Sequence, residues 1–159
     1  MVREIAEKVT GPRIKTGLLA GMAGRFAPYG PFFLRLMAGI VFFAHGYSKL
    51  QHPAGFIGLL TNIHMPFAFY LGWFVMLLET VGSVALILGL AVRYLGLFYI
   101  VEMATTTWLV KRNLGLVAPP RSPAPGYELD LLLLFIALAL VLLGPGALSI
   151  ERNLLRREL

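Results

Sequence analysis

Four long apolar blocks, separated by short connections that are charged or rich in proline and glycine, dominate this 159-residue sequence. The blocks cover about 31–50, 67–92, 94–111 and 128–147. The hydrocarbon core of a bilayer is about 30 Å thick, and a helix of roughly 20 apolar residues crosses it. Backbone groups in lipid must be satisfied within the spanning segment, which favours helices over irregular structure. We therefore predict an all-α fold, namely an integral membrane four-helix bundle.

The composition agrees with this prediction, because 58% of the residues are hydrophobic and only 14% are charged. A soluble domain of this length needs more charge on its surface. We expect one four-helix domain over residues 31–150, preceded by a cytoplasmic N-terminal segment, 1–30, and followed by a basic cytoplasmic tail, 151–159. The N-terminal segment mixes charged and apolar positions, so it is either an amphipathic surface helix or a frayed tail.

The distribution of lysine and arginine predicts the orientation in the membrane. With four crossings, one side carries ten of these residues (six in 1–35, Arg93 and three in 151–159), and the other side carries four. The positive-inside rule then places both termini in the cytoplasm of a multi-pass protein of the inner (plasma) membrane. The net charge of +6 comes mainly from the two ends of the chain, which suits a bilayer surface and not nucleic acid.

Local signals refine the predicted helices. Residues 56–60 predict a short interfacial helix between the first two spans, and Gly144-Pro145-Gly146 should end the last span. Small residues let membrane helices approach closely. The glycines expected at such contacts are Gly39, Gly46, Gly72, Gly82, Gly89 and Gly96.

Ionisable residues inside the apolar blocks are the candidates for function. A charge near the bilayer centre costs roughly 2.5–3.5 kcal/mol on insertion scales, so Glu79 should point into the bundle toward a partner or a wet cavity. His45 lies at a similar depth, and Lys49 lies one turn further along the same helix face. Glu128 and Asp130 enter at the same level on the last helix. We expect these five side chains to surround one pocket.

A structural interpretation of the same residues also has to be kept. Lys49 can extend to the interface, and Glu128 and Asp130 can be favoured by the positive end of their helix. Arg35 can anchor the cytoplasmic end of the first span. For Glu102 we predict a structural ion pair with Arg35.

No metal site is predicted, because the chain has no cysteine and no histidine–carboxylate pair at the spacing typical of zinc sites. The absence of cysteine also means that the chain has no thiol relay of its own. Haem is disfavoured because His45 is the one histidine within a predicted span.

The chain resembles the DoxX family of small membrane proteins. The resemblance covers about residues 34–151 and depends on the order and spacing of several short motifs. These are Arg35, His45-Gly-Tyr-Ser-Lys49, Glu79-Thr-Val-Gly82, Gly89-Leu-Ala-Val-Arg93, Tyr127-Glu-Leu129 and Gly144-Pro-Gly-Ala-Leu-Ser149. It implies a four-helix bundle linked to oxidoreductase systems, and it implies recurrent polar positions at Arg35, His45, Lys49, Glu79 and Glu128. Relatives often carry a histidine where this chain has Lys111.

Two functions are compatible with these observations. The first is a membrane subunit of a quinone-linked oxidoreductase system, with His45 and Glu79 as catalytic residues that move protons. Ligand-binding residues would be Arg35, Lys49, Glu128 and Asp130. Quinone would be the cofactor, and electrons would come from a redox partner protein. The alternative is a non-enzymatic protein that binds a small molecule, lets it permeate the membrane, or docks a redox enzyme at the membrane. A homo-oligomer is compatible with either function.

Overall fold

The computed structural model describes residues 17–122 and 124–155. In this part of the chain every regular element is a helix, which confirms the predicted all-α class. The elements are α2 (Leu18–Phe26), η1 (Ala27–Tyr29), α3 (Gly30–Gln51), α4 (Pro53–Asn62), α5 (Ala68–Leu77), η2 (Leu78–Gly82), α6 (Ser83–Leu88), α7 (Val92–Thr106), η3 (Thr107–Lys111), η4 (Arg112–Leu114), α8 (Glu128–Leu143) and η5 (Glu151–Leu155).

Two helical stretches are long and apolar enough to cross a membrane. They are Leu19–Gln51, which joins α2, η1 and α3, and Ala68–Leu88, which joins α5, η2 and α6. At about 1.5 Å per residue, α3 alone extends over about 33 Å. The third predicted span corresponds to α7 with η3, which carry several charged residues, and the fourth corresponds to the 16-residue α8.

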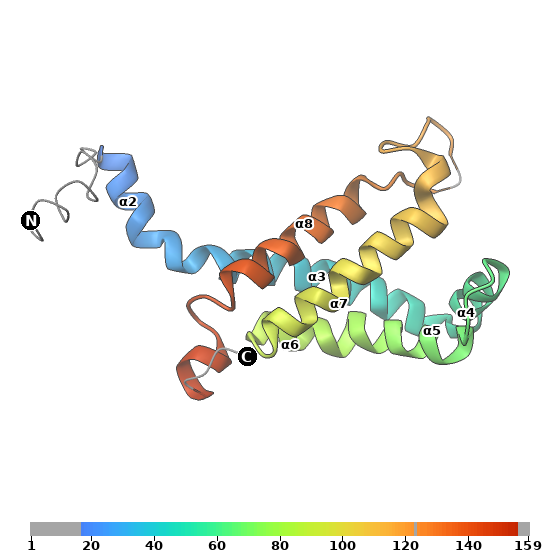
Figure 1. The fold of residues 1–159 in the computed structure, drawn as a ribbon, viewed down its shortest axis with the longest axis horizontal. Coiled ribbons are helices and arrows are strands. Elements are labelled where there is room, and N and C mark those ends of the chain that lie inside the picture. Colours follow the sequence, from blue (N-terminus) through green and yellow to red (C-terminus); the bar gives the residue numbers. More distant parts are fainter. Residues whose placement is uncertain (1–16, 123, 156–159) are drawn as a thin grey trace, which may run out of the picture.

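The two long connections of the chain lie at the same end of the molecule. Helix α4 and the loop between α7 and α8 are both at the right of Figure 1, whereas the short α6–α7 link and η5 lie at the opposite end of the packed helices. Helix α4 is the short helix predicted in the first connection, although it begins three residues earlier than expected. The helices between these connections therefore run alternately toward one end and toward the other.

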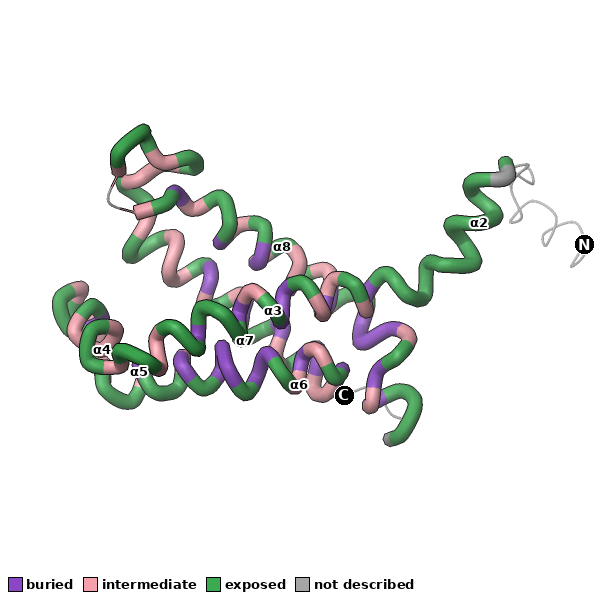
Figure 2. Tube along the Cα trace, turned by 180° about the vertical axis from the view of Figure 1, so that it is seen from behind, coloured by how far each residue is buried: buried purple, intermediate pink, exposed green. Residues whose placement is uncertain are grey.

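The core forms where α3 packs against η2 and α6, and where α7 packs against α8. Buried positions follow the facing sides of these helices in Figure 2, whereas α2 is exposed along its whole described length. The aromatic centre of this core is a stacked pair, Phe42 and Tyr99, with ring centroids 3.8 Å apart. Residues 1–16 of the predicted N-terminal segment lie outside the described residues, and 17–30 are helical from Leu18 onward.

Arg35 is fully buried, and it corrects the predicted ion pair with Glu102. Its Nη1 donates to the carbonyl oxygens of Leu86 (3.2 Å) and Ile87 (2.9 Å), at the end of α6. Its Nη2 donates to the carbonyls of Ala147 (3.1 Å) and Leu148 (3.3 Å), after α8. Backbone oxygens at the ends of two helices therefore accept from both Nη groups of the guanidinium, as its planar set of donors allows.

The bend after α6 depends on a glycine. Gly89 adopts φ +74°, and a Cβ there would meet Arg35 Nη1 at 2.5 Å and Ser149 Cβ at 2.5 Å. Its carbonyl accepts the backbone N–H of Glu151 (3.2 Å), whose buried carboxylate also attracts Arg35 electrostatically. Gly144, at φ +75°, ends α8 where the Gly-Pro-Gly motif predicts.

Gly46 allows a close approach between α3 and the helical stretch Ala68–Leu88. A Cβ at this position would meet the Glu79 Cβ at 2.6 Å and the Glu79 backbone carbon at 2.8 Å. Backbone atoms cannot rotate aside as a side chain can, so any larger residue would push the two helices apart.

We expect Gly46→Ala to lower the free energy of unfolding by about 1–3 kcal/mol, since overpacking of a close helix contact costs about that much. The matched control is Gly58→Ala in α4, where an added Cβ meets nothing within 4 Å and helix propensity favours alanine. Unfolding of both variants in detergent measures the difference. Equal stability of the two variants would contradict this account of Gly46.

Candidate functional site

A cavity of about 250 Å³ opens between the helices at the end of the molecule that carries α4. Residues of α3, α4, η2, α7, η3 and α8 all line it. Most of the lining is apolar and includes Phe42, Leu60, Met103 and Leu133. Small-molecule sites in proteins typically have such a lining, with a few polar groups that set orientation.

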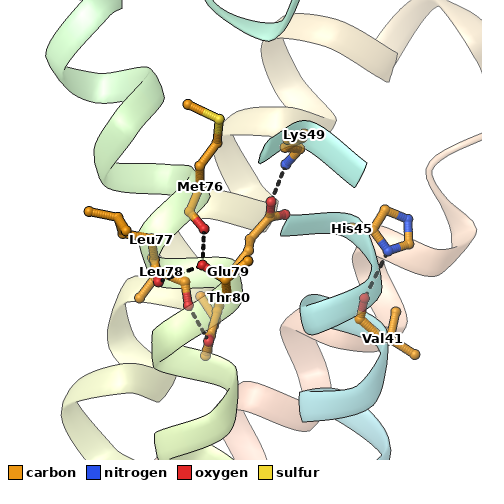
Figure 3. A network of polar contacts seen from close by, with 9 residues as sticks. Val41, His45, Lys49, Met76, Leu77, Leu78, Glu79 and Thr80 are labelled. Atoms are coloured by element: carbon orange, nitrogen blue, oxygen red, sulfur yellow. Dashed lines mark hydrogen bonds and ion pairs between the residues drawn. The ribbon is translucent and has the colours of Figure 1, made fainter. Parts of the chain in front are cut away.

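Lys49 and Glu79 form the first ion pair of the cavity wall. Lys49 Nζ on α3 donates to Glu79 Oε2 on η2 at 2.5 Å, as Figure 3 shows. The Glu79 side chain is 3% exposed and the Lys49 side chain is 26% exposed. Lys49 also lies 4.6 Å from the ring centroid of Phe56 on α4. A carboxylate removed from solvent needs such a cation, because desolvation without a partner is costly.

A π-helical turn, η2, carries Glu79 and widens the helix at this point. Hydroxyl groups satisfy carbonyl oxygens in and beside the turn. Thr80 Oγ1 donates to the Met76 carbonyl (2.6 Å), Ser83 Oγ donates to the Thr80 carbonyl (2.7 Å), and Tyr99 Oη donates to the Leu78 carbonyl (2.8 Å). Single π turns in α-helices occur frequently at functional sites.

Lys111 and Asp130 form a second ion pair in the cavity wall, on the other helix pair. Lys111 Nζ, at the end of the π-helical turn η3, donates to Asp130 Oδ1 on α8 at 2.7 Å. The side chain of Asp130 is 6% exposed and that of Lys111 is 20% exposed. Lys111, the last residue of the third predicted span, therefore supplies a cation to the candidate site.

Glu102 on α7 lies close to the charges of the candidate site. It interacts electrostatically with Glu79, Lys49 and Asp130. Its Oε2 is buried and has no hydrogen-bond partner among the described residues. Glu102 therefore adds an acid beside the Lys49–Glu79 pair.

The structure brings together four of the six residues expected from the sequence. His45, Lys49, Glu79 and Asp130 all line the cavity, whereas Arg35 and Glu128 do not. Glu128 is exposed in the first turn of α8, and Arg35 is buried toward the opposite end of α3.

His45 lines the cavity but does not bond to Glu79. Its Nδ1 donates to the Val41 carbonyl of its own helix at 2.9 Å, because a carbonyl can only accept. Figure 3 shows the imidazole beside α3, away from the contact between Lys49 and Glu79. The residue is exposed, so Nε2 is left available at the edge of the cavity.

Three residues of the site were missed from the sequence: Glu102, Lys111 and Tyr99. The signals for the first two were present, since both are charges within or directly after an apolar block. Tyr99 gave none, since tyrosine is common in apolar helices. Among the described residues, no group of three His, Asp or Glu side chains is arranged to hold a metal ion.

Fold and cavity together define a class of protein: an all-helical chain with membrane-length apolar helices and a small cavity walled by paired charges. The chain belongs to the DoxX family, whose model matches residues 30–112, from the start of α3 to the first residue of η4. The family is membrane-associated, which agrees with the two long apolar helical stretches. The resemblance found in the motifs is thereby confirmed, although α8 and Asp130 lie beyond the matched segment.

Two curated relatives extend the comparison. A protein of Bacillus subtilis (strain 168), named "Putative oxidoreductase CatD", is 32% identical over 122 residues, covering 77% of this chain and 84% of the relative. An "Uncharacterized protein" of Haemophilus influenzae is 30% identical over 138 residues, covering 84% of this chain and 96% of the relative. The comparison with solved structures found no significant match.

The Lys49–Glu79 pair predicts an asymmetric double-mutant cycle. Lys49→Met alone should destabilise the fold by up to about 3–5 kcal/mol, because it leaves a buried carboxylate without its cation. Adding Glu79→Gln should recover most of the loss, since both charges are then gone. The free energy of unfolding in detergent is measured for Lys49→Met, for Glu79→Gln and for the double variant.

Glu128→Gln serves as the control for this cycle, because Glu128 is exposed, and it should stay within about 0.5 kcal/mol of the natural chain. If the single and double variants were equally unstable, the pairing would not be what stabilises Glu79.

Proposed function

We propose that this chain is a membrane subunit of a quinone-linked oxidoreductase system and that its cavity binds the quinone ring. The observation that supports the proposal best is the combination of two ion pairs in the wall of a largely apolar cavity. The name of the Bacillus subtilis relative supports an oxidoreductase-associated role.

The residues of the cavity suit a neutral ring with polar oxygens. Phe42, Met103 and Leu133 offer apolar surface for the ring. Lys49 and Lys111 each carry three N–H donors, of which one is used on Glu79 or Asp130. The remaining donors can bind the carbonyl oxygens of a ligand that enters between them.

A bound quinone supplies an acceptor for two electrons and two protons. Glu79 lines the cavity, so its carboxyl group can carry a proton to a ligand oxygen. His45, at the exposed edge of the same cavity, can return a proton from solvent through Nε2. Electrons come from a redox partner protein, because this chain has no thiols to carry them.

The proposal includes the topology predicted from the sequence, with four crossings of the inner (plasma) membrane and both termini in the cytoplasm. The arrangement of the helices supports it, because α4 and the α7–α8 loop share one end of the molecule. The cavity then opens toward the outer half of the bilayer, where a lipid-soluble ligand can reach it between the helices.

The alternative is that the same cavity binds or passes a small molecule without turnover, or that the chain docks a redox enzyme. Quinone turnover separates the two functions. Only the oxidoreductase function predicts that a variant that cannot transfer protons also loses quinone turnover.

The topology can be tested without background, because the natural chain has no cysteine. In right-side-out vesicles, an impermeant maleimide should label Asn62→Cys and Ser122→Cys directly. Gly17→Cys and Asn153→Cys should be labelled only after the membrane is opened. Labelling of positions 62 and 122 on different sides would disprove four crossings, and the unmodified chain is the control.

The quinone site predicts that protein purified in native lipid retains quinone, and that Lys49→Met/Glu79→Gln lowers the retained amount at least about tenfold, since charged hydrogen bonds are worth about 1.5–3 kcal/mol each. Quinone content is measured by extraction and chromatography. Arg112→Gln, at an exposed cation outside the cavity, should retain the natural amount.

Quinone reduction in native membranes then separates the two functions. Glu79→Gln alone should lower turnover strongly if the chain is part of the enzyme. Retained quinone with unchanged turnover would favour the binding or docking function, and absence of quinone from the natural protein would reject the site.

A further inference from the structure

Asp130 carries a hydrogen-bond acceptor that the fold leaves unused. The residue is 4% exposed and lines the cavity from the first turn of α8. Its Oδ1 accepts from Lys111 Nζ, but its Oδ2 is buried and has no hydrogen-bond partner among the described residues. A buried acceptor without a donor is costly, and more so when it is charged, so we expect a ligand to bring a donor to Oδ2.

The charges around the cavity indicate a neutral donor. Among the lining side chains, Glu79 and Asp130 supply two carboxylates, and Lys49 and Lys111 pair with them. The two pairs balance, so the cavity wall has no excess negative charge for a cationic ligand. A hydroxyl group satisfies Oδ2 without disturbing this balance.

The apolar part of the wall determines what bears the hydroxyl. Phe42, Met103 and Leu133 lie on the same cavity as Asp130, and a volume of about 250 Å³ admits one small ring. A ring hydroxyl next to Asp130 and a second ring oxygen near Lys49 would use the polar groups of both helix pairs.

We propose that Asp130 Oδ2 accepts the hydroxyl hydrogen of a ring ligand, so that the cavity binds the reduced quinol in preference to the quinone. This inference rests on the proposed function and adds the redox form that the site selects. A quinone has only acceptors and would leave Oδ2 without a donor, so the same site binds it less tightly than the quinol.

The test uses the full chain in lipid nanodiscs with three probes: duroquinol, duroquinone and the dimethyl ether of duroquinol. Dissociation constants are measured by equilibrium dialysis under anaerobic conditions. The natural protein should bind duroquinol at least about tenfold more tightly than duroquinone or the ether, because only duroquinol donates to a charged acceptor.

Asp130→Asn should reverse this order. The amide oxygen would keep Lys111 as its donor and turn the NH₂ group toward the cavity, replacing an acceptor with a donor. The variant should then bind duroquinone more tightly than duroquinol. Glu128→Gln removes an acid from the same turn of α8 but outside the cavity, and it should leave the preference unchanged.

The possible outcomes separate this inference from the proposed function. Tight binding of duroquinol and duroquinone without a preference would overturn the role of Asp130 and leave the quinone site standing. Binding of none of the three probes would reject both. If Asp130→Asn does not fold, the comparison of duroquinol with its dimethyl ether on the natural protein decides alone, since equal affinities contradict donation to Oδ2.

Discussion

The ion pair between Lys49 and Glu79 sets the geometry on which the site depends. It joins the first long helix to the π-helical turn of the second, and Gly46 permits the approach by leaving no Cβ between them. A buried charge pair of this kind contributes little net stability compared with apolar packing, but it penalises every arrangement that separates the partners. The pair therefore specifies the position of the cavity wall.

The lengths of the apolar blocks predicted the helices. A bilayer sets the length that each block needs, and the connections carry residues that stop a helix. The sequence also predicted that Glu79 points into the bundle and shares one pocket with Lys49, since a carboxylate in an apolar helix needs a partner or a wet cavity. Asp130 was expected near the same pocket on the same ground. Glu128 was not distinguishable from Asp130, because which of two acids in one helical turn faces inward depends on how α8 rotates against α7.

Lys111 was missed as a site residue because its helix departs from regular α-helical geometry. On a regular α-helix, at about 100° per residue, positions 102 and 111 lie about 180° apart, so sequence spacing alone does not place Lys111 near Glu102. The π-helical turn η3 removes part of that rotation.

The error at Arg35 has a different cause. Arg35 was paired with Glu102 because a cation was expected to pair with a carboxylate, whereas in the structure carbonyl oxygens accept from its Nη groups.

The acceptors of Arg35 also impose an order on biosynthesis. Leu86 and Ile87 follow Arg35 by 51 and 52 residues, but Ala147 and Leu148 follow it by 112 and 113. The guanidinium leaves the ribosome long before its last two carbonyl partners are translated. Until then Arg35 Nη2 lacks its two native acceptors. The packing of the first helix against the segment after α8 is therefore completed only after Ala147 and Leu148 are translated.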